Sequence, residues 1–385
     1  MKYGVLFGIM VLVFGAGCNR DTQGGVAEID VLSMMGKEKI SSIEDLTRDV
    51  SIIKIDTGDS IFLSKDATIK LIDDNNIYLE SEHQLMRFDK NGKFLNYIGH
   101  RGEGPGEYPY VGRVFMNDAD NIVLSNSQRL MEFEKDGTQK RVVPITRDFV
   151  SLMLTPDMNI RGIHREFDSS GGVEETMVTV DPTGNITDKQ ILYKDFVPMS
   201  IVWNGVPQRY IVNGKEFLRN EWSCSVIEID DNMKPKPMAH FDFDDKEPSR
   251  FNYQDAMGRK KLGVSVVDLS TWITNGRYSF MRIFYKDALY LVAVDHKTGE
   301  SIFSCRYDKN TVLTGKPGIA LKGMESVTVW PDFVDQKGNL YGFVDPGFVS
   351  EEDFDKLKEL TGKFFSGEDN YFIVKLGMRD EIFNQ

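Results

Sequence analysis

Two segments of this 385-residue chain repeat each other, residues 76–92 and residues 121–137. They align without a gap at a spacing of 45 residues. In each, a short apolar run is followed by a second apolar run that ends in a polar turn with a glycine. A period of about 40 to 50 residues is typical of β-propeller blades, in which each repeat forms one small antiparallel sheet. The repeat therefore predicts an all-β ring.

Weaker copies of the same unit continue along the chain. An acidic residue opens the hairpin turn in five copies: Asp89, Glu134, Asp181, Asp230 and Asp295. A sixth copy opens at residues 335–341 and ends at residues 371–376. We therefore predict a six-bladed β-propeller of four-stranded antiparallel blades over residues 27–385. The spacing from Asp230 to Asp295 is 65 residues, which predicts an insertion between the fourth and fifth blades, within residues 244–277.

Local patterns give details of the first blade. Asn91-Gly92 lies between alternating apolar residues, which predicts a tight primed turn with positive φ angles. Residues 99–106 hold four glycines and a proline, a composition that predicts an irregular crossing to the next blade.

The last blade is predicted to carry a short helical insertion. Ser350 is a candidate N-cap, since acidic residues follow it directly. Apolar residues then recur at helical spacing, which predicts a helix packed on one face of the propeller. These residues are Phe354, Leu357, Leu360 and Phe364. An N-terminal strand, residues 50–55 or 27–32, is expected to close the ring by pairing in the blade of residues 371–376, because an unpaired edge is otherwise left.

The first residues predict export. Lys2 precedes a short apolar run over residues 5–14, too short to cross a bilayer. Small residues at 15–17 then lead to Cys18, a pattern that resembles a bacterial lipobox. The resemblance implies a signal peptide at residues 1–17 and a lipidated Cys18 as the mature N-terminus. Residues 18–26 would form a polar tether to the propeller.

Charge and cysteine content exclude some classes of protein. The formal net charge of −13 and the isoelectric point near 5.0 argue against nucleic-acid binding, which needs a basic face. An exported protein could pair Cys224 with Cys305, but the two lie far apart and lack zinc-site spacing, so we expect two buried free thiols on strands.

The hairpin at residues 88–92 and the crossing at residues 99–108, with its Gly-x-Gly-Pro-Gly-Glu-Tyr sequence, together resemble a known family. It comprises the six-bladed β-propeller lipoproteins of glycan-degrading gut bacteria, which are similar to NHL-repeat propellers. The resemblance implies six four-stranded blades and a location in the cell envelope. It implies no particular activity, because the fold carries both enzymes and binding proteins.

Motifs for catalysis are lacking. The glycine-rich crossing is followed by neither a helix start nor a Lys-Ser/Thr pair, so it is not a phosphate loop. The Asp/Asn clusters near residues 73–76 and 117–121 are read as turns, because they lack the spacing of a calcium loop. The five histidines show no metal-binding spacing, and no Gly-x-Ser-x-Gly sequence occurs.

Candidate site residues lie where inner strands are expected to begin, because those positions line one mouth of a propeller channel. The candidates are Arg113, Ser151, Trp203, Trp272, Asn275, Arg277 and Glu325. Trp203 and Trp272 stand beside turns or the expected insertion. Each would either stack on a flat ligand such as a sugar or pack between blades.

We therefore predict an envelope-anchored propeller that binds a glycan, a peptide or a partner protein at one channel mouth. The prediction leans against catalysis and requires no cofactor. An alternative is a metal-dependent hydrolase or lyase acting on a sugar-derived substrate, since carboxylates from separate blades could hold a channel metal without a local motif. A third is an accessory subunit of an outer-membrane uptake complex. The expected location is the outer membrane, facing the periplasm or the surface, with the bilayer as a partner through acylated Cys18.

Overall fold

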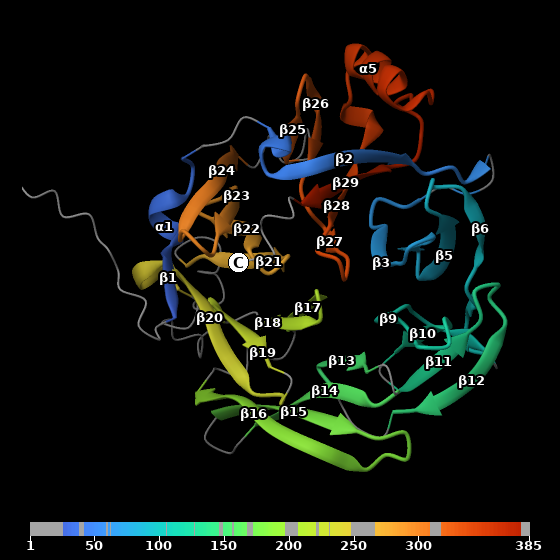
Figure 1. Cartoon of the computed structure of the whole chain (residues 1–385), viewed down its shortest axis with the longest axis vertical. Helices are drawn as coiled ribbons and strands as arrows, with labels where there is room; N and C mark the ends of the chain where they lie inside the picture. Colours follow the sequence, from blue (N-terminus) through green and yellow to red (C-terminus); the bar gives the residue numbers. More distant parts are fainter. Residues whose placement is uncertain are drawn as a thin grey trace, which may run out of the picture.

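Six sheets surround a central axis, so the chain is a six-bladed β-propeller (Figure 1). Each contains four antiparallel strands, and one of them gains a fifth. The computed structural model describes residues 26–37, 42–58, 61, 63–104, 106–126, 128–145, 149–155, 158–167, 172–196, 207–220, 223–230, 232–247, 266–308 and 317–378. The predicted signal peptide, Cys18, most of the tether and Trp203 lie outside these residues.

Each blade runs from an inner strand near the axis to an outer strand. The first two blades are β3 (Thr68–Ile72), β4 (Asn76–Ser81), β5 (Gln84–Asp89), β6 (Phe94–Tyr97), and β9 (Val114–Met116), β10 (Ile122–Ser125), β11 (Arg129–Phe133), β12 (Gln139–Pro144). The third and fourth are β13 (Ser151–Leu154), β14 (Ile160–Phe167), β15 (Gly172–Val180), β16 (Ile186–Phe196), and β17 (Gln208–Val212), β18 (Lys215–Arg219), β19 (Ser225–Ile229), β20 (Pro235–Asp242). The fifth is β21 (Asp268–Thr274), β22 (Tyr278–Tyr285), β23 (Ala288–Asp295) and β24 (Glu300–Asp308). The sixth is β27 (Phe333–Val334), β28 (Leu340–Val344), β29 (Phe372–Met378) and β2 (Thr47–Lys54).

The N-terminal region closes the ring, as predicted. Strand β2 pairs antiparallel with β29, with Val50 opposite Leu376 and Ile52 opposite Val374. The outer strand of the last blade thus comes from the start of the domain. Strand β1 (Ala27–Asp30) instead adds to the fourth blade, parallel to β20. Helix α1 (Val31–Met34) and the short 3-10 turn η1 (Ile43–Asp45) connect β1 to β2.

The hairpin turn at Asn91-Gly92 differs from the predicted primed turn. Gly92 has a φ of +89°, but Asn91 is not among the residues with positive φ. The Asp89 carboxylate accepts hydrogen bonds from the backbone N–H groups of Asn91 (2.8 Å) and Lys93 (3.0 Å). It thereby stabilises a right-handed turn that ends in a left-handed glycine, the arrangement of a longer hairpin loop with a bulge.

The glycine-rich crossing is irregular, as predicted, and forms the small parallel pair β7 (His100–Arg101) and β8 (Glu107–Tyr108). Tyr108 is fully buried, and its hydroxyl donates to the carbonyl of Ile98 (2.7 Å) while accepting from the Leu85 N–H (3.1 Å). A Cβ at Gly99 would lie 2.7 Å from the Phe133 ring, so the crossing needs glycine there.

The predicted helix is α5 (Glu351–Thr361), where the Ser350 side chain accepts from the Asp353 N–H as an N-cap. Phe354 and Leu357 are buried, whereas Leu360 and Phe364 are 64% and 68% exposed. The apolar stripe therefore packs only through its first half. A further hairpin, β25 (Ile319–Leu321) and β26 (Met324–Val329), also precedes the last blade, and the 3-10 turn η5 (Pro346–Phe348) precedes the helix.

The insertion predicted within residues 244–277 falls mainly on residues outside the described ones. The 3-10 turn η3 (Asp244–Lys246) follows β20, residues 248–265 lie outside the described residues, and residues 268–274 form the inner strand β21. The long spacing between copies thus comes partly from the longer strands of the fifth blade. No disulfide joins Cys224 and Cys305 in the described part of the chain; Cys224 is buried, as expected, whereas Cys305 is half-buried.

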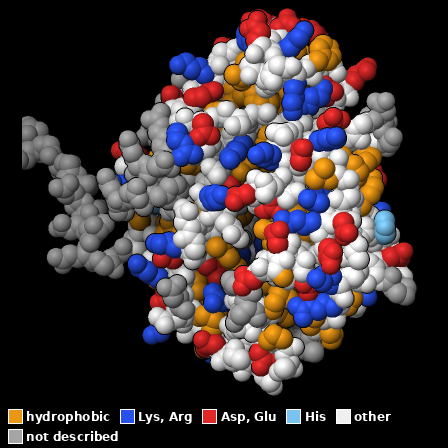
Figure 2. All heavy atoms as spheres, turned by 45° about the vertical axis from the view of Figure 1, so that its right-hand side comes forward, with side chains coloured by type: hydrophobic (Ala, Val, Ile, Leu, Met, Phe, Trp, Pro, Cys, Tyr) orange, Lys and Arg blue, Asp and Glu red, His pale blue; other side chains and the backbone are white. Residues whose placement is uncertain are grey.

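The outer surface carries mixed charge. On the face shown in Figure 2, Lys and Arg side chains are interspersed with Asp and Glu. Within the described residues, no helix has the length and apolar character needed to cross a membrane.

Candidate functional site

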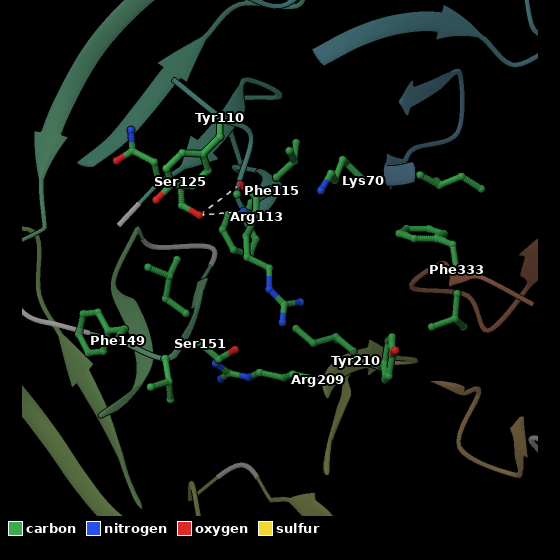
Figure 3. A pocket seen from close by; sticks show the side chains of 18 of the residues that line it. Lys70, Tyr110, Arg113, Phe115, Ser125, Phe149, Ser151, Arg209, Tyr210 and Phe333 are labelled. Carbon is green, nitrogen blue, oxygen red and sulfur yellow. Dashed lines mark hydrogen bonds between the residues drawn. The ribbon is translucent and has the colours of Figure 1, made fainter. Parts of the chain in front are cut away.

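A cavity of roughly 610 Å³ lies among the inner strands of the ring (Figure 3). Its walls come from β3, β9, β13, β17 and β27 and from the loops that lead into them. Five of the six blades therefore contribute to one hollow, which agrees with the expectation that residues at inner-strand starts line the channel.

Aromatic side chains form much of the wall: Tyr110, Phe115, Phe149, Tyr210 and Phe333. Tyr110 is 37% exposed and so presents part of its ring to solvent. Phe149 lies against Gly162, where a Cβ would come within 2.2 Å of the Phe149 ring. The Tyr210 ring contacts Trp272 edge to face at 5.4 Å, and its hydroxyl donates to the Trp272 carbonyl (2.7 Å). Burial raises the pKa of Tyr210 to about 12, so this hydroxyl stays protonated.

Arg113 lies just before β9 and extends into the hollow in Figure 3. Its backbone is clamped by Ser125, whose hydroxyl accepts from the Arg113 N–H (3.0 Å). Gly112 permits this approach, because a Cβ there would lie 2.3 Å from the Ser125 carbonyl oxygen. The guanidinium itself makes one long hydrogen bond, to the Pro207 carbonyl (3.5 Å). Burial, followed by the positive charge of Arg209, lowers the pKa of Arg113.

Arg209 in β17 is the second guanidinium of the cavity and is 6% exposed. It donates to the Glu216 carboxylate and to the Arg161 carbonyl (3.0 Å). Glu216 also accepts from the Arg161 side chain at 3.3 Å, so one carboxylate serves two arginines. The Nη2 atom of Arg209 is buried and has no hydrogen-bond partner in the part of the chain that the structure describes.

Ser151, the first residue of β13, completes the polar part of the wall. Its side chain is 5% exposed, and its Oγ is buried without a hydrogen-bond partner. Ser151 and Arg209 both line the cavity (Figure 3). Two other charged residues of the wall are paired: Lys70 with Glu80 (3.0 Å) and Asp332 with Arg282 (2.9 Å).

The predicted site residues therefore fall into two groups, those that line the cavity and those that lie elsewhere. Arg113 and Ser151 meet in the cavity. Trp272 in β21 is fully buried, so its ring has no face open to a ligand. Its Nε1 donates to Ser279 Oγ (2.7 Å). Of the two roles expected for Trp272, the structure shows packing between blades.

Asn275, Arg277 and Glu325 lie away from the cavity wall. Asn275 is fully buried and caps the β21–β22 turn, accepting from the Tyr278 N–H (2.9 Å). Arg277 is paired with Asp295 (2.8 Å). Glu325 is exposed on β26, in the hairpin beside α5.

Sequence reasoning missed Arg209, Tyr210 and Phe333. Arg209 and Tyr210 belong to the inner strand of the fourth blade, which the weak repeat around residues 226–230 did not locate. A usable indication existed, because Pro207 comes just before a short run that ends in the strand-favouring residues 210–212, and proline is tolerated at the start of a strand.

Two serine–histidine pairs lie elsewhere. Ser279 Oγ contacts His296 Nε2 at 2.7 Å, but Ser279 is fully buried and out of reach of a substrate. His240 bridges Ser225 and Glu247, at 2.9 Å each, outside the cavity wall. The described part of the chain contains no group of three or more His, Cys, Asp or Glu side chains that could hold a metal ion.

Comparison with known proteins identifies solved structures with a similar fold and a matching family. A solved structure from Bacteroides fragilis, of a protein described as exported, superposes with a TM-score of 0.63 at 16% identity, covering 92% of this chain and 100% of that one. A member of the DUF4221 family from Bacteroides vulgatus gives a TM-score of 0.47 at 12% identity, covering 86% and 96%. At these identities the likeness concerns the fold. A search among curated proteins found no match. Residues 26–376 match the family described as "Domain of unknown function (DUF4934)". The chain therefore belongs to the DUF4934 family.

Proposed function

We propose that the protein is an exported propeller that binds a polar, sugar-sized ligand in its central cavity and does not convert it. The cavity of roughly 610 Å³ carries the proposal. Its size lies within the range of about 300 to 1,000 Å³ for small-molecule sites, which are mostly apolar with a few placed polar groups. The aromatic rings offer flat faces for a sugar, and the donors of Arg113 and Ser151 face the same space.

Binding without turnover is favoured by the state of the cavity serine. A serine becomes a nucleophile when an adjacent base takes its proton. The Ser151 hydroxyl has no hydrogen-bonded base in the described part of the chain, and no histidine is among the residues of the cavity wall. The guanidinium groups of Arg113 and Arg209 offer hydrogen-bond donors and no acceptor, so they suit binding more than proton transfer.

The N-terminal pattern supports export and a lipid anchor at Cys18, and the Bacteroides fragilis relative is described as exported. We place the protein in the envelope, held to the outer membrane through this cysteine. In cell fractionation, a Cys18→Ser variant should move from the membrane fraction to the soluble one. Retention of that variant in the membrane fraction would contradict the anchor.

The cavity is tested with a panel of neutral and acidic oligosaccharides in isothermal titration calorimetry. Tyr110→Ala should weaken the binding of any ligand found, because the half-exposed ring would lose its contact. Phe364→Ala is the matched control, since it removes an exposed aromatic side chain that lies after α5. Equal loss in both variants, or no loss in either, would place the ligand elsewhere. Chromatography of the ligand after long incubation should show no product.

A further inference from the structure

The cavity holds more positive than negative charge among its described residues. Lys70 and Asp332 are neutralised by Glu80 and Arg282, as given above. Arg209 and Arg161 share the single carboxylate of Glu216. Arg113 has no carboxylate partner in the described part of the chain, only the carbonyl of Pro207. Two guanidinium charges are therefore left without a counter-charge, in a protein whose formal net charge is −13.

Unused hydrogen-bond donors lie in the same place. The Oγ of Ser151 and the Nη2 of Arg209 are both buried and have no hydrogen-bond partner among the described residues; the two residues are 5% and 6% exposed. An unsatisfied buried donor costs about 1–3 kcal/mol, so native proteins seldom leave one without a reason. A bound acceptor would satisfy both donors at once.

We infer that the cavity binds an oxyanion carried by the ligand, with Arg113, Arg209 and Ser151 as its donors. The inference rests on the proposed function and specifies the ligand class as an acidic sugar. A guanidinium presents a rigid fork of N–H donors that matches the oxygens of a carboxylate or a sulfate. Either group would supply the missing negative charge and accept from the serine hydroxyl, while the sugar ring contacts the aromatic wall.

Three probes test separately whether the cavity recognises the negative charge or the sugar ring: D-galacturonate, D-galactose and inorganic sulfate. Binding to the full domain is measured by calorimetry at low and at raised salt. We expect Arg113→Gln to weaken galacturonate and sulfate by about ten- to a hundredfold, the range for hydrogen bonds to charged groups. Ser151→Ala should weaken both anions by a smaller factor. Raised salt should weaken both by screening.

Arg306→Gln is the matched control, because Arg306 is a half-exposed arginine of β24 that pairs with Asp308 (2.7 Å) outside the cavity. It should leave all affinities unchanged. Thermal melts establish that each variant is folded before its affinity is compared.

The outcomes distinguish this inference from the proposed function. Galactose binding as tight as galacturonate binding, and unaffected by Arg113→Gln, would overturn the oxyanion site while leaving sugar binding intact. Sulfate binding that depends on Arg113, without binding of any sugar, would support the oxyanion site and overturn the proposed function. An absence of binding by all three probes would overturn both.

Discussion

Arg113 is positioned by its backbone and not by a counter-charge. Its half-buried guanidinium lies near Arg209, and this burial together with like-charge repulsion lowers its pKa. A buried charge without a partner destabilises the folded state. We therefore expect Arg113→Met to raise the free energy of unfolding by about 1 kcal/mol, although it weakens ligand binding. Denaturant unfolding of both proteins measures the difference, and a variant less stable than the parent would show that Arg113 has a structural role.

The buried His296 side chain makes the free energy of unfolding depend on pH, and the direction of the effect can be predicted. Burial lowers its pKa to about 4, against the opposing effect of Asp295. In the unfolded chain the pKa of this histidine is near 6.5. At a pH between that value and the folded pKa, the unfolded chain binds a proton that the native protein does not, so the free energy of unfolding falls as the pH falls. His296→Gln retains an acceptor for the Ser279 hydroxyl but cannot titrate. From near pH 7 to near pH 4.5, the variant should lose about 2 kcal/mol less stability than the parent.

His240 is the matched control, because its pKa shift has the opposite sign. The hydrogen bond to Glu247 raises the pKa of His240. The stability that this pair contributes is therefore fully present below the unfolded pKa and is lost as the pH rises through the folded one. His240→Gln should cost most stability at acidic pH. If both variants changed the pH profile in the same direction, the assignment to these two side chains would be wrong.

At the scale of elements, the buried Tyr108 side chain makes several of the hydrogen bonds at the crossing between the first two blades. The buried Tyr108 hydroxyl bonds to Ile98, Leu85 and Gln84. Tyr108→Phe leaves these groups without their partner, and we expect a loss of about 1–3 kcal/mol in the free energy of unfolding. Tyr285→Phe is the control, because this buried tyrosine has no hydroxyl hydrogen bond in the described structure and should change stability little. Equal effects of the two substitutions would contradict the role of the crossing.

Local chemistry explains which elements were predictable from sequence. The N-cap of α5 depends on Ser350 and Asp353, three residues apart, and was predicted correctly. The turn at Asn91-Gly92 was located correctly but given the wrong type, because the Asp89 carboxylate selects the right-handed form. Leu360 and Phe364 show the limit of periodicity, since spacing marks a helical face without showing how far the neighbouring surface extends.

At the scale of the whole molecule, the ring depends on strand β2. It supplies the outer strand of the last blade and covers an edge that would otherwise be open. Deleting residues 26–56 should abolish cooperative unfolding, as measured by circular dichroism during heating. Deleting residues 26–34 should leave a folded but less stable protein, because β1 adds a fifth strand to a blade that already has four. A 26–56 deletion that melts like the parent would refute closure by β2.

The cavity shows why a site is harder to predict than a fold. The repeat and the hairpins follow from patterns local to a blade, and the closing strand follows from the edge that the ring would otherwise leave open. Together these predicted the ring. Arg113, Ser151 and Arg209 come from three different blades and meet only when the ring closes. Arg113 and Ser151 were identified by their place at inner-strand starts. Trp272 lies on such a strand too, but its ring is buried between blades, because strand position does not determine the direction of a side chain.

The oxyanion site is the central claim, and a crystal structure with selenate tests it most directly. Selenate has the shape and charge of sulfate, and its selenium can be located by anomalous scattering. We predict an anomalous peak within hydrogen-bond distance of Arg113, Arg209 and Ser151 in the parent protein, and no peak there in Arg113→Gln. A parent cavity without selenate, in a crystal that binds the ion at other sites, would contradict the claim.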